Sequence, residues 1–89
     1  KAAGQSWKVV KPKHFRGYGQ PLYELLAEAN RAGNKRPTAA DVLTAWRANK
    51  PPQVFKVLLN SLEYWSANGE IEEAKPDAIR KAIGRMTTK

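Results

Sequence analysis

Apolar residues recur every three or four positions in three stretches of the chain, and this spacing marks one face of a helix. The first stretch follows Pro21 and stops before Gly33. It predicts a helix over residues 21–32, because proline suits the first helical turn and glycine the end. The last stretch begins at Pro76 and predicts a helix over residues 76–87.

The second stretch is bounded by residues that cap and interrupt helices. Thr38 and Asp41 have the spacing of a capping box, which predicts a helix starting at residue 39. Pro51-Pro52 ends the apolar run, since proline disfavours helix in its own position and in the residue before it. A helix is therefore expected over residues 39–49.

A further helix is predicted over residues 52–67. Its apolar residues cover more than half of a helical wheel, which is typical of the central helix of a small bundle. Asn68-Gly69 supplies a stop after it. Residues 70–75 fit either a short strand or a loop.

These elements predict an all-α domain over residues 21–89, a small bundle of four helices around Trp46, Leu58, Leu62 and Trp65. Residues 1–20 lack a sustained period and are broken by glycine and proline. We expect them to form an extended, basic, aromatic N-terminal arm.

Composition excludes several classes of protein. The 89 residues fit one domain and contain no cysteine, which excludes a disulfide scaffold and a thiolate zinc site. No apolar run approaches the ~18 residues of a membrane span. Positions 1–10 lack the apolar segment of a signal peptide. We expect no membrane partner and, by default, a cytoplasmic (intracellular) location.

Positive charge is concentrated at the two ends of the chain. The net charge is +8, with +5 in positions 1–20, −3 in positions 51–74 and +4 in positions 75–89. A surface evolved only for solubility would mix the signs. Concentrated basic segments favour an anionic partner, although charged ends can also serve solubility alone.

Residues for catalysis do not converge in the sequence. His14 is the only histidine, and it lies between Lys13 and Arg16 in the arm. One histidine with scattered carboxylates does not supply a zinc site, and no glycine-rich phosphate loop is present. We expect no enzyme activity, no metal and no cofactor.

Three features favour binding to nucleic acid. In the arm, aromatic residues alternate with lysine and arginine, a pattern that suits phosphates and exposed bases. The same aromatics (Trp7, Phe15 and Tyr18) could instead fix the arm to the core. The helix over 76–87 places Arg80, Lys81 and Arg85 opposite its apolar face, and the alternative is that this face is merely solvated.

The third feature is the pair of helices predicted over 39–49 and 52–67, whose apolar spacing resembles a helix-turn-helix. The polar strip of the second helix offers Gln53, Lys56 and Asn60, which are residue types that pair with base edges. Any helical bundle also contains two helices joined by a turn.

The sequence therefore predicts a non-enzymatic nucleic-acid-binding domain, with DNA favoured over RNA. The alternative is a protein-interaction module that forms a homodimer or binds an acidic protein through its two-signed surface. Candidate nucleic-acid-binding residues are Lys8, Lys11, Lys13, Arg16, Lys35, Arg36, Gln53, Lys56, Asn60, Arg80, Lys81 and Arg85.

Overall fold

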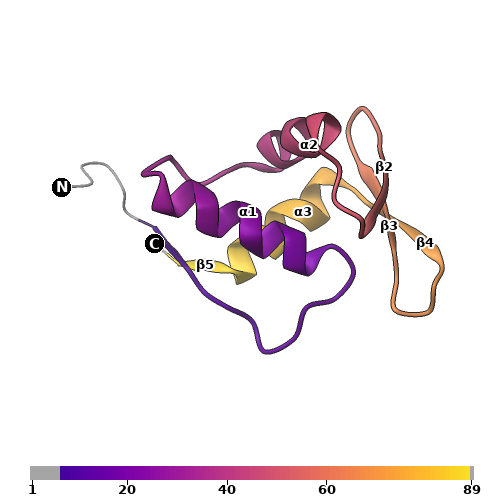
Figure 1. Cartoon of the computed structure of the whole chain (residues 1–89), viewed down its shortest axis with the longest axis horizontal. Helices are drawn as coiled ribbons and strands as arrows, with labels where there is room; N and C mark the ends of the chain where they lie inside the picture. The colour runs from indigo at the N-terminus through magenta and orange to yellow at the C-terminus, as the bar shows by residue number, and fades with distance from the viewer. Residues whose placement is uncertain (1–6, 89) are drawn as a thin grey trace.

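The computed structural model describes residues 7–88, in which three helices lie between two antiparallel sheets (Figure 1). The elements are β1 (Lys8–Val9), α1 (Gly19–Arg31), α2 (Ala39–Ala48), β2 (Val54–Val57), β3 (Leu62–Trp65), β4 (Ile71–Ala74), α3 (Pro76–Arg85) and β5 (Thr87–Thr88). The all-α bundle of four helices predicted from the sequence is therefore wrong. The first six residues of the expected arm lie outside the described residues.

The helices predicted around the two proline starts and the capping box are present. Each observed helix begins and ends within two residues of its predicted bounds. At the start of α2 the capping box is complete: Asp41 N donates to Thr38 Oγ1 at 3.2 Å, and Thr38 N donates to Asp41 Oδ2 at 3.0 Å. These reciprocal bonds satisfy two donors that a helix start otherwise leaves unpaired.

The helix expected over residues 52–67 is instead a β-hairpin formed by β2 and β3. Val57 stands opposite Leu62, and Leu58 N closes the turn by donating to Ser61 O at 2.8 Å. The segment is rich in valine and aromatic residues, which favour a pleated strand. Its apolar residues look continuous because both faces of the hairpin carry them.

Asn68-Gly69, expected to end a helix, turns the chain from β3 into β4. Gly69 has a φ of +80°, and Ser66 N donates to Glu70 O at 2.7 Å across the turn. Leu62 then pairs with Ala74, and Trp65 with Ile71. Of the two structures expected for residues 70–75, the strand is the correct one.

The core lies where the three helices meet the inner face of this sheet. Leu22, Leu26, Val42, Val54 and Ile79 are fully buried there, together with Leu62 and the nearly buried Trp46. Trp65, which the helical wheel placed in the core, is 42% exposed on the outer face. A strand alternates its side chains between two faces, so burying Leu62 and packing the partly buried Tyr64 against the core turns Trp65 outward.

The two ends of the described chain meet in the small sheet. Lys8 pairs with Thr88, and Val10 N donates to Met86 O at 2.7 Å. Figure 1 shows this sheet at one end of the molecule and β2–β4 at the other. The segment after β1 therefore runs beside α1 and brings the first basic stretch toward α3.

Trp7 anchors that segment and is 5% exposed. Its Nε1 donates to Asn34 O at 3.0 Å, and Asn30 Nδ2 donates to the Trp7 carbonyl at 2.8 Å. Phe15 packs on Tyr23 with ring centroids 5.6 Å apart. Two roles were considered for the aromatic residues of the arm: stacking on bases or fixing the arm to the core. The contacts of Trp7 and Phe15 match the second role.

Candidate nucleic-acid interface

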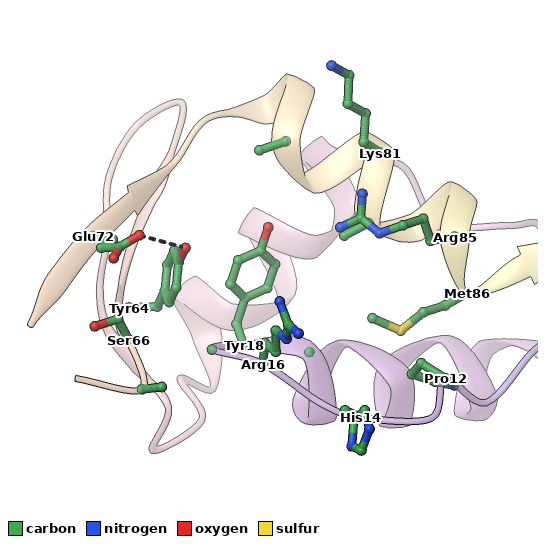
Figure 2. Close-up of a pocket in the computed structure, with 15 residues that line it drawn as sticks. Pro12, His14, Arg16, Tyr18, Tyr64, Ser66, Glu72, Lys81, Arg85 and Met86 are labelled. Atoms are coloured by element: carbon green, nitrogen blue, oxygen red, sulfur yellow. Dashed lines mark hydrogen bonds between the residues drawn. The ribbon is translucent and has the colours of Figure 1, made fainter. Parts of the chain in front are cut away.

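An open cleft of about 1150 Å³ lies between three parts of the chain. Residues from Pro12 to Gly19 form its first wall, α3 forms the second, and β3 and β4 with the turn between them form the third. We call this hollow the cationic cleft, because Arg16, Lys81 and Arg85 line it (Figure 2). The cleft thus combines cations from both basic ends of the sequence.

Two guanidinium groups are directed into this cleft. Figure 2 shows Arg85 reaching in from α3 and Arg16 from the segment before α1, while Lys81 extends outward at the rim. Within residues 7–88, Arg16 and Arg85 form no ion pair with a carboxylate. An arginine without an acidic partner keeps its charge and its planar set of donors available for an anion.

The other cations of α3 are partly neutralised by Asp77. Arg80 donates to Asp77 Oδ1 one turn away, and Lys81 Nζ lies 3.8 Å from Asp77 Oδ2. The hydrogen bond and charge of Arg80 hold the pKa of Asp77 below its ordinary value. Arg85 is therefore the α3 cation most available to a ligand.

Two tyrosines from facing walls meet inside the cleft. The rings of Tyr18 and Tyr64 meet edge to face with centroids 4.8 Å apart. Burial raises the pKa of the Tyr18 hydroxyl, Tyr64 adds to the rise, and the positive charge of Arg85 opposes it. Both hydroxyls accordingly stay protonated at neutral pH and can donate hydrogen bonds.

Glu72 adds one acidic group beside these donors. Tyr64 Oη donates to Glu72 Oε1 at 3.3 Å (dashed in Figure 2). Burial is the main cause of the raised pKa of Tyr64, and the charge and hydrogen bond of Glu72 raise it further. Tyr64 and Glu72 were not among the predicted binding residues, because Tyr64 was expected on a helix and residues 70–75 fitted either a short strand or a loop.

The cleft includes only three of the predicted binding residues. Lys11 and Lys13 are exposed on the segment that leads to Arg16, and Lys8 lies on β1. Lys35 and Arg36 lie between α1 and α2, where Arg36 Nη1 donates to Thr87 Oγ1 at 3.3 Å. Those two residues line a different part of the surface.

The proposed base-reading helix does not exist in the described residues. Gln53 precedes β2, Lys56 lies in β2 opposite Glu63, and Asn60 lies in the hairpin turn. None of the three lines the cationic cleft. The predicted helix-turn-helix is therefore wrong. A hairpin follows α2, so the second helix that would enter the major groove is missing.

The outer face of the three-stranded sheet has a different character. Phe55 and Trp65 are 43% and 42% exposed, with ring centroids 5.4 Å apart, and Ile71 stands opposite Trp65. Strand alternation places Glu63 and Glu73 on this same face. Carboxylates beside the aromatic pair make the outer face less suited to a polyanion than the cationic cleft.

Membrane-spanning helices and metal-binding clusters are both absent from residues 7–88. No helix there has the length and apolar character needed to cross a membrane. No group of three or more metal-ligating side chains is assembled in the same residues.

No protein-family model, curated protein or solved structure matches this chain.

Proposed function

We propose that this chain is a non-enzymatic nucleic-acid-binding domain that contacts phosphates through the cationic cleft. The observation that carries the proposal is the convergence of Arg16 and Arg85, from opposite ends of the chain, in one cleft without carboxylate partners. Guanidinium groups bind phosphate oxygens with two parallel hydrogen bonds. The hydroxyl of Tyr18 lies close enough to Arg85 to feel its charge and adds a neutral donor.

The mode of binding differs from that of a helix-turn-helix. Because a hairpin and not a helix directly follows α2, nothing in the described fold favours reading bases in a duplex major groove. A strand lying along the cleft would meet Lys11 and Lys13 at one end and Lys81 at the rim. We therefore propose that contact with the backbone supplies most of the affinity. A nucleic-acid partner also motivates a proposed cytoplasmic location.

The test is a salt titration of binding to a labelled single strand, followed by fluorescence anisotropy. The variant Arg16→Gln/Arg85→Gln removes two cations from the cleft. Its matched control, Arg31→Gln/Lys75→Gln, removes two exposed cations that do not line the cleft and are not among the predicted binding residues. For single strands the slope of log affinity against log salt is about −0.7 for each phosphate neutralised.

We expect the cleft variant to bind at least about tenfold more weakly at low salt, with a slope smaller by roughly 1.4. The control should keep most of the wild-type slope. Equal loss in both variants would show that net charge alone drives binding. Absence of binding to any single strand or duplex at low salt would remove the proposal.

The outer face of the sheet supports a second candidate, a protein-interaction module. Phe55, Trp65 and Ile71 form an exposed apolar cluster on a small domain, and such clusters mark interaction surfaces. Size-exclusion chromatography with light scattering separates the two candidates. A tight, salt-insensitive dimer that does not shift nucleic acid would favour this second function.

A further inference from the structure

Glu72 is the feature of the cleft that a phosphate-binding site does not explain. It is exposed on β4, and its Oε1 accepts from Tyr64 Oη at 3.3 Å. Within residues 7–88 its other oxygen, Oε2, accepts no hydrogen bond, and no lysine or arginine pairs with it. Figure 2 shows Glu72 and Tyr64 together on the sheet wall, with Tyr18 between Tyr64 and Arg85 of α3 in this view.

A carboxylate in this position selects among the groups of a bound strand. An ionised carboxylate accepts hydrogen bonds and donates none. It repels a phosphate placed next to it, and it attracts an O–H or N–H group. A nucleotide whose phosphate is bound by the arginines can therefore make a favourable contact with Glu72 only if it presents a hydrogen-bond donor to this carboxylate.

We propose that the cationic cleft selects nucleotides that present a hydrogen-bond donor to Glu72 while Arg16 and Arg85 hold the phosphate. In nucleic acids that donor is either the ribose 2′-hydroxyl or an exocyclic amine of a base. The inference rests on the proposed function, and it adds selectivity to what would otherwise be uniform binding of a backbone.

The experiment compares three single strands of equal length: oligocytidylate, oligodeoxycytidylate and an abasic strand of tetrahydrofuran units, which lack both the base and the 1′-hydroxyl. The first carries both donors, the second carries only the amine, and the third carries neither. Each is titrated into the wild-type chain, Glu72→Ala and Glu63→Ala. Glu63→Ala is the matched control, because Glu63 lies on the same sheet, on the outer face, and does not line the cleft.

Glu72→Ala should change the binding affinities of the donor-bearing and abasic oligonucleotides differently. A charge-assisted hydrogen bond is lost from the donor-bearing strand, which should bind about tenfold more weakly. The abasic strand loses a repulsion and should bind equally well or more tightly. Glu63→Ala should change the affinity for no strand by more than about twofold, since Glu63 lies on the outer face of the sheet and does not line the cleft.

The pattern of loss identifies the donor. A loss confined to oligocytidylate supports the 2′-hydroxyl, and a loss for both cytosine strands supports the amine. A common change for all three strands in Glu72→Ala overturns the selectivity and leaves the proposed function standing. Failure of the wild-type chain to bind any of the strands overturns both.

Discussion

The backbone of Gly17 lies against the ring of Tyr64 so closely that a Cβ at position 17 would be 2.5 Å from Tyr64 Cε2. Gly17 also has a φ of +54°, a conformation that side chains other than glycine rarely adopt. This contact fixes how the segment carrying Arg16 and Tyr18 meets the sheet. The cleft therefore depends on the absence of a side chain at this position.

Gly17→Ala should destabilise the fold by about 2–4 kcal/mol, because it combines a left-handed backbone with a forced shift of the Tyr64 ring. Gly33→Ala is the control, since Gly33 has a φ of +80° and nothing within 4 Å of its would-be Cβ. It should cost only about 1–2 kcal/mol. Urea denaturation measures both, and equal costs would contradict the contact with Tyr64.

Gly84→Ala should act in the opposite direction. Gly84 lies in α3 with open space around it and a helical conformation. Alanine there should raise the free energy of unfolding by up to about 1 kcal/mol through helix propensity. A destabilisation in the same urea experiment would mean that neighbouring atoms crowd a Cβ at position 84, which would contradict the open space there.

Trp7→Ala should cost about 3–5 kcal/mol, since it empties a buried aromatic position at the junction of β1, α1 and β5. A small domain is stable by only about 5–15 kcal/mol, so this variant should lose much of its cooperative transition. Trp65→Ala is the comparison, because Trp65 is 42% exposed, and its cost should be clearly smaller. Thermal unfolding followed by circular dichroism checks the order.

Trp7→Phe separates the packing of Trp7 from its hydrogen bond. Phenylalanine keeps most of the buried area and loses the donor to Asn34 O. The expected cost of the hydrogen bond is about 0.5–1.5 kcal/mol. A cost as large as that of Trp7→Ala would indicate that shape, rather than the bond, sets the stability.

Arg85→Gln should raise the pKa of Tyr18 further, because the charge of Arg85 lowers it in the wild-type chain. Tyrosinate absorbance during an alkaline titration reports the change, and Tyr18→Phe assigns the signal. Arg31→Gln, at the far end of α1 from Tyr18, should leave that titration unchanged. A phosphate bound at Arg85 should also raise the pKa of Tyr18, because it neutralises the positive charge that lowers it.

Stability should fall at alkaline pH through both cleft tyrosines. Their pKa values are raised in the folded state, mainly by burial. The unfolded chain therefore loses these protons first, so the contribution is intact below about pH 10 and declines as pH rises through the raised values. Tyr18→Phe/Tyr64→Phe should flatten this decline in a series of thermal melts, and an unchanged decline would contradict the assignment.

The sequence was sufficient for elements whose signals are local. Thr38 and Asp41 marked the start of α2, Pro76 marked the start of α3, and the glycine after α1 marked its end. Each signal depends on hydrogen bonds or dihedral angles within a few residues. Tertiary contacts did not alter them.

The hairpin could not be recovered from hydrophobic periodicity alone. Phe55 and Trp65 are apolar and exposed, so the alternation of a half-buried strand is absent. The turn at Leu58–Ser61 contains no glycine or proline to interrupt the pattern. The valine and aromatic content of the segment was the available signal for strands.

The cleft was predicted only in part for the same reason. Arg16, Lys81 and Arg85 were expected from charge, which is visible in the sequence. Tyr64 and Glu72 meet them only because β3 and β4 form a sheet beside α3, and that pairing depends on long-range contacts. The helix that was expected to present Gln53, Lys56 and Asn60 is replaced by a hairpin, because the strand pairing of that segment depends on contacts that its own periodicity does not report.

Backbone amide chemical shifts during titration with a short single strand test the central claim most directly, because they map the contacted surface residue by residue. We expect the largest changes in residues 12–19, in the β3–β4 turn and Glu72 of β4, and in α3 from Lys81 to Arg85. Changes centred on Phe55 and Trp65, or spread evenly over all exposed lysines and arginines, would contradict it.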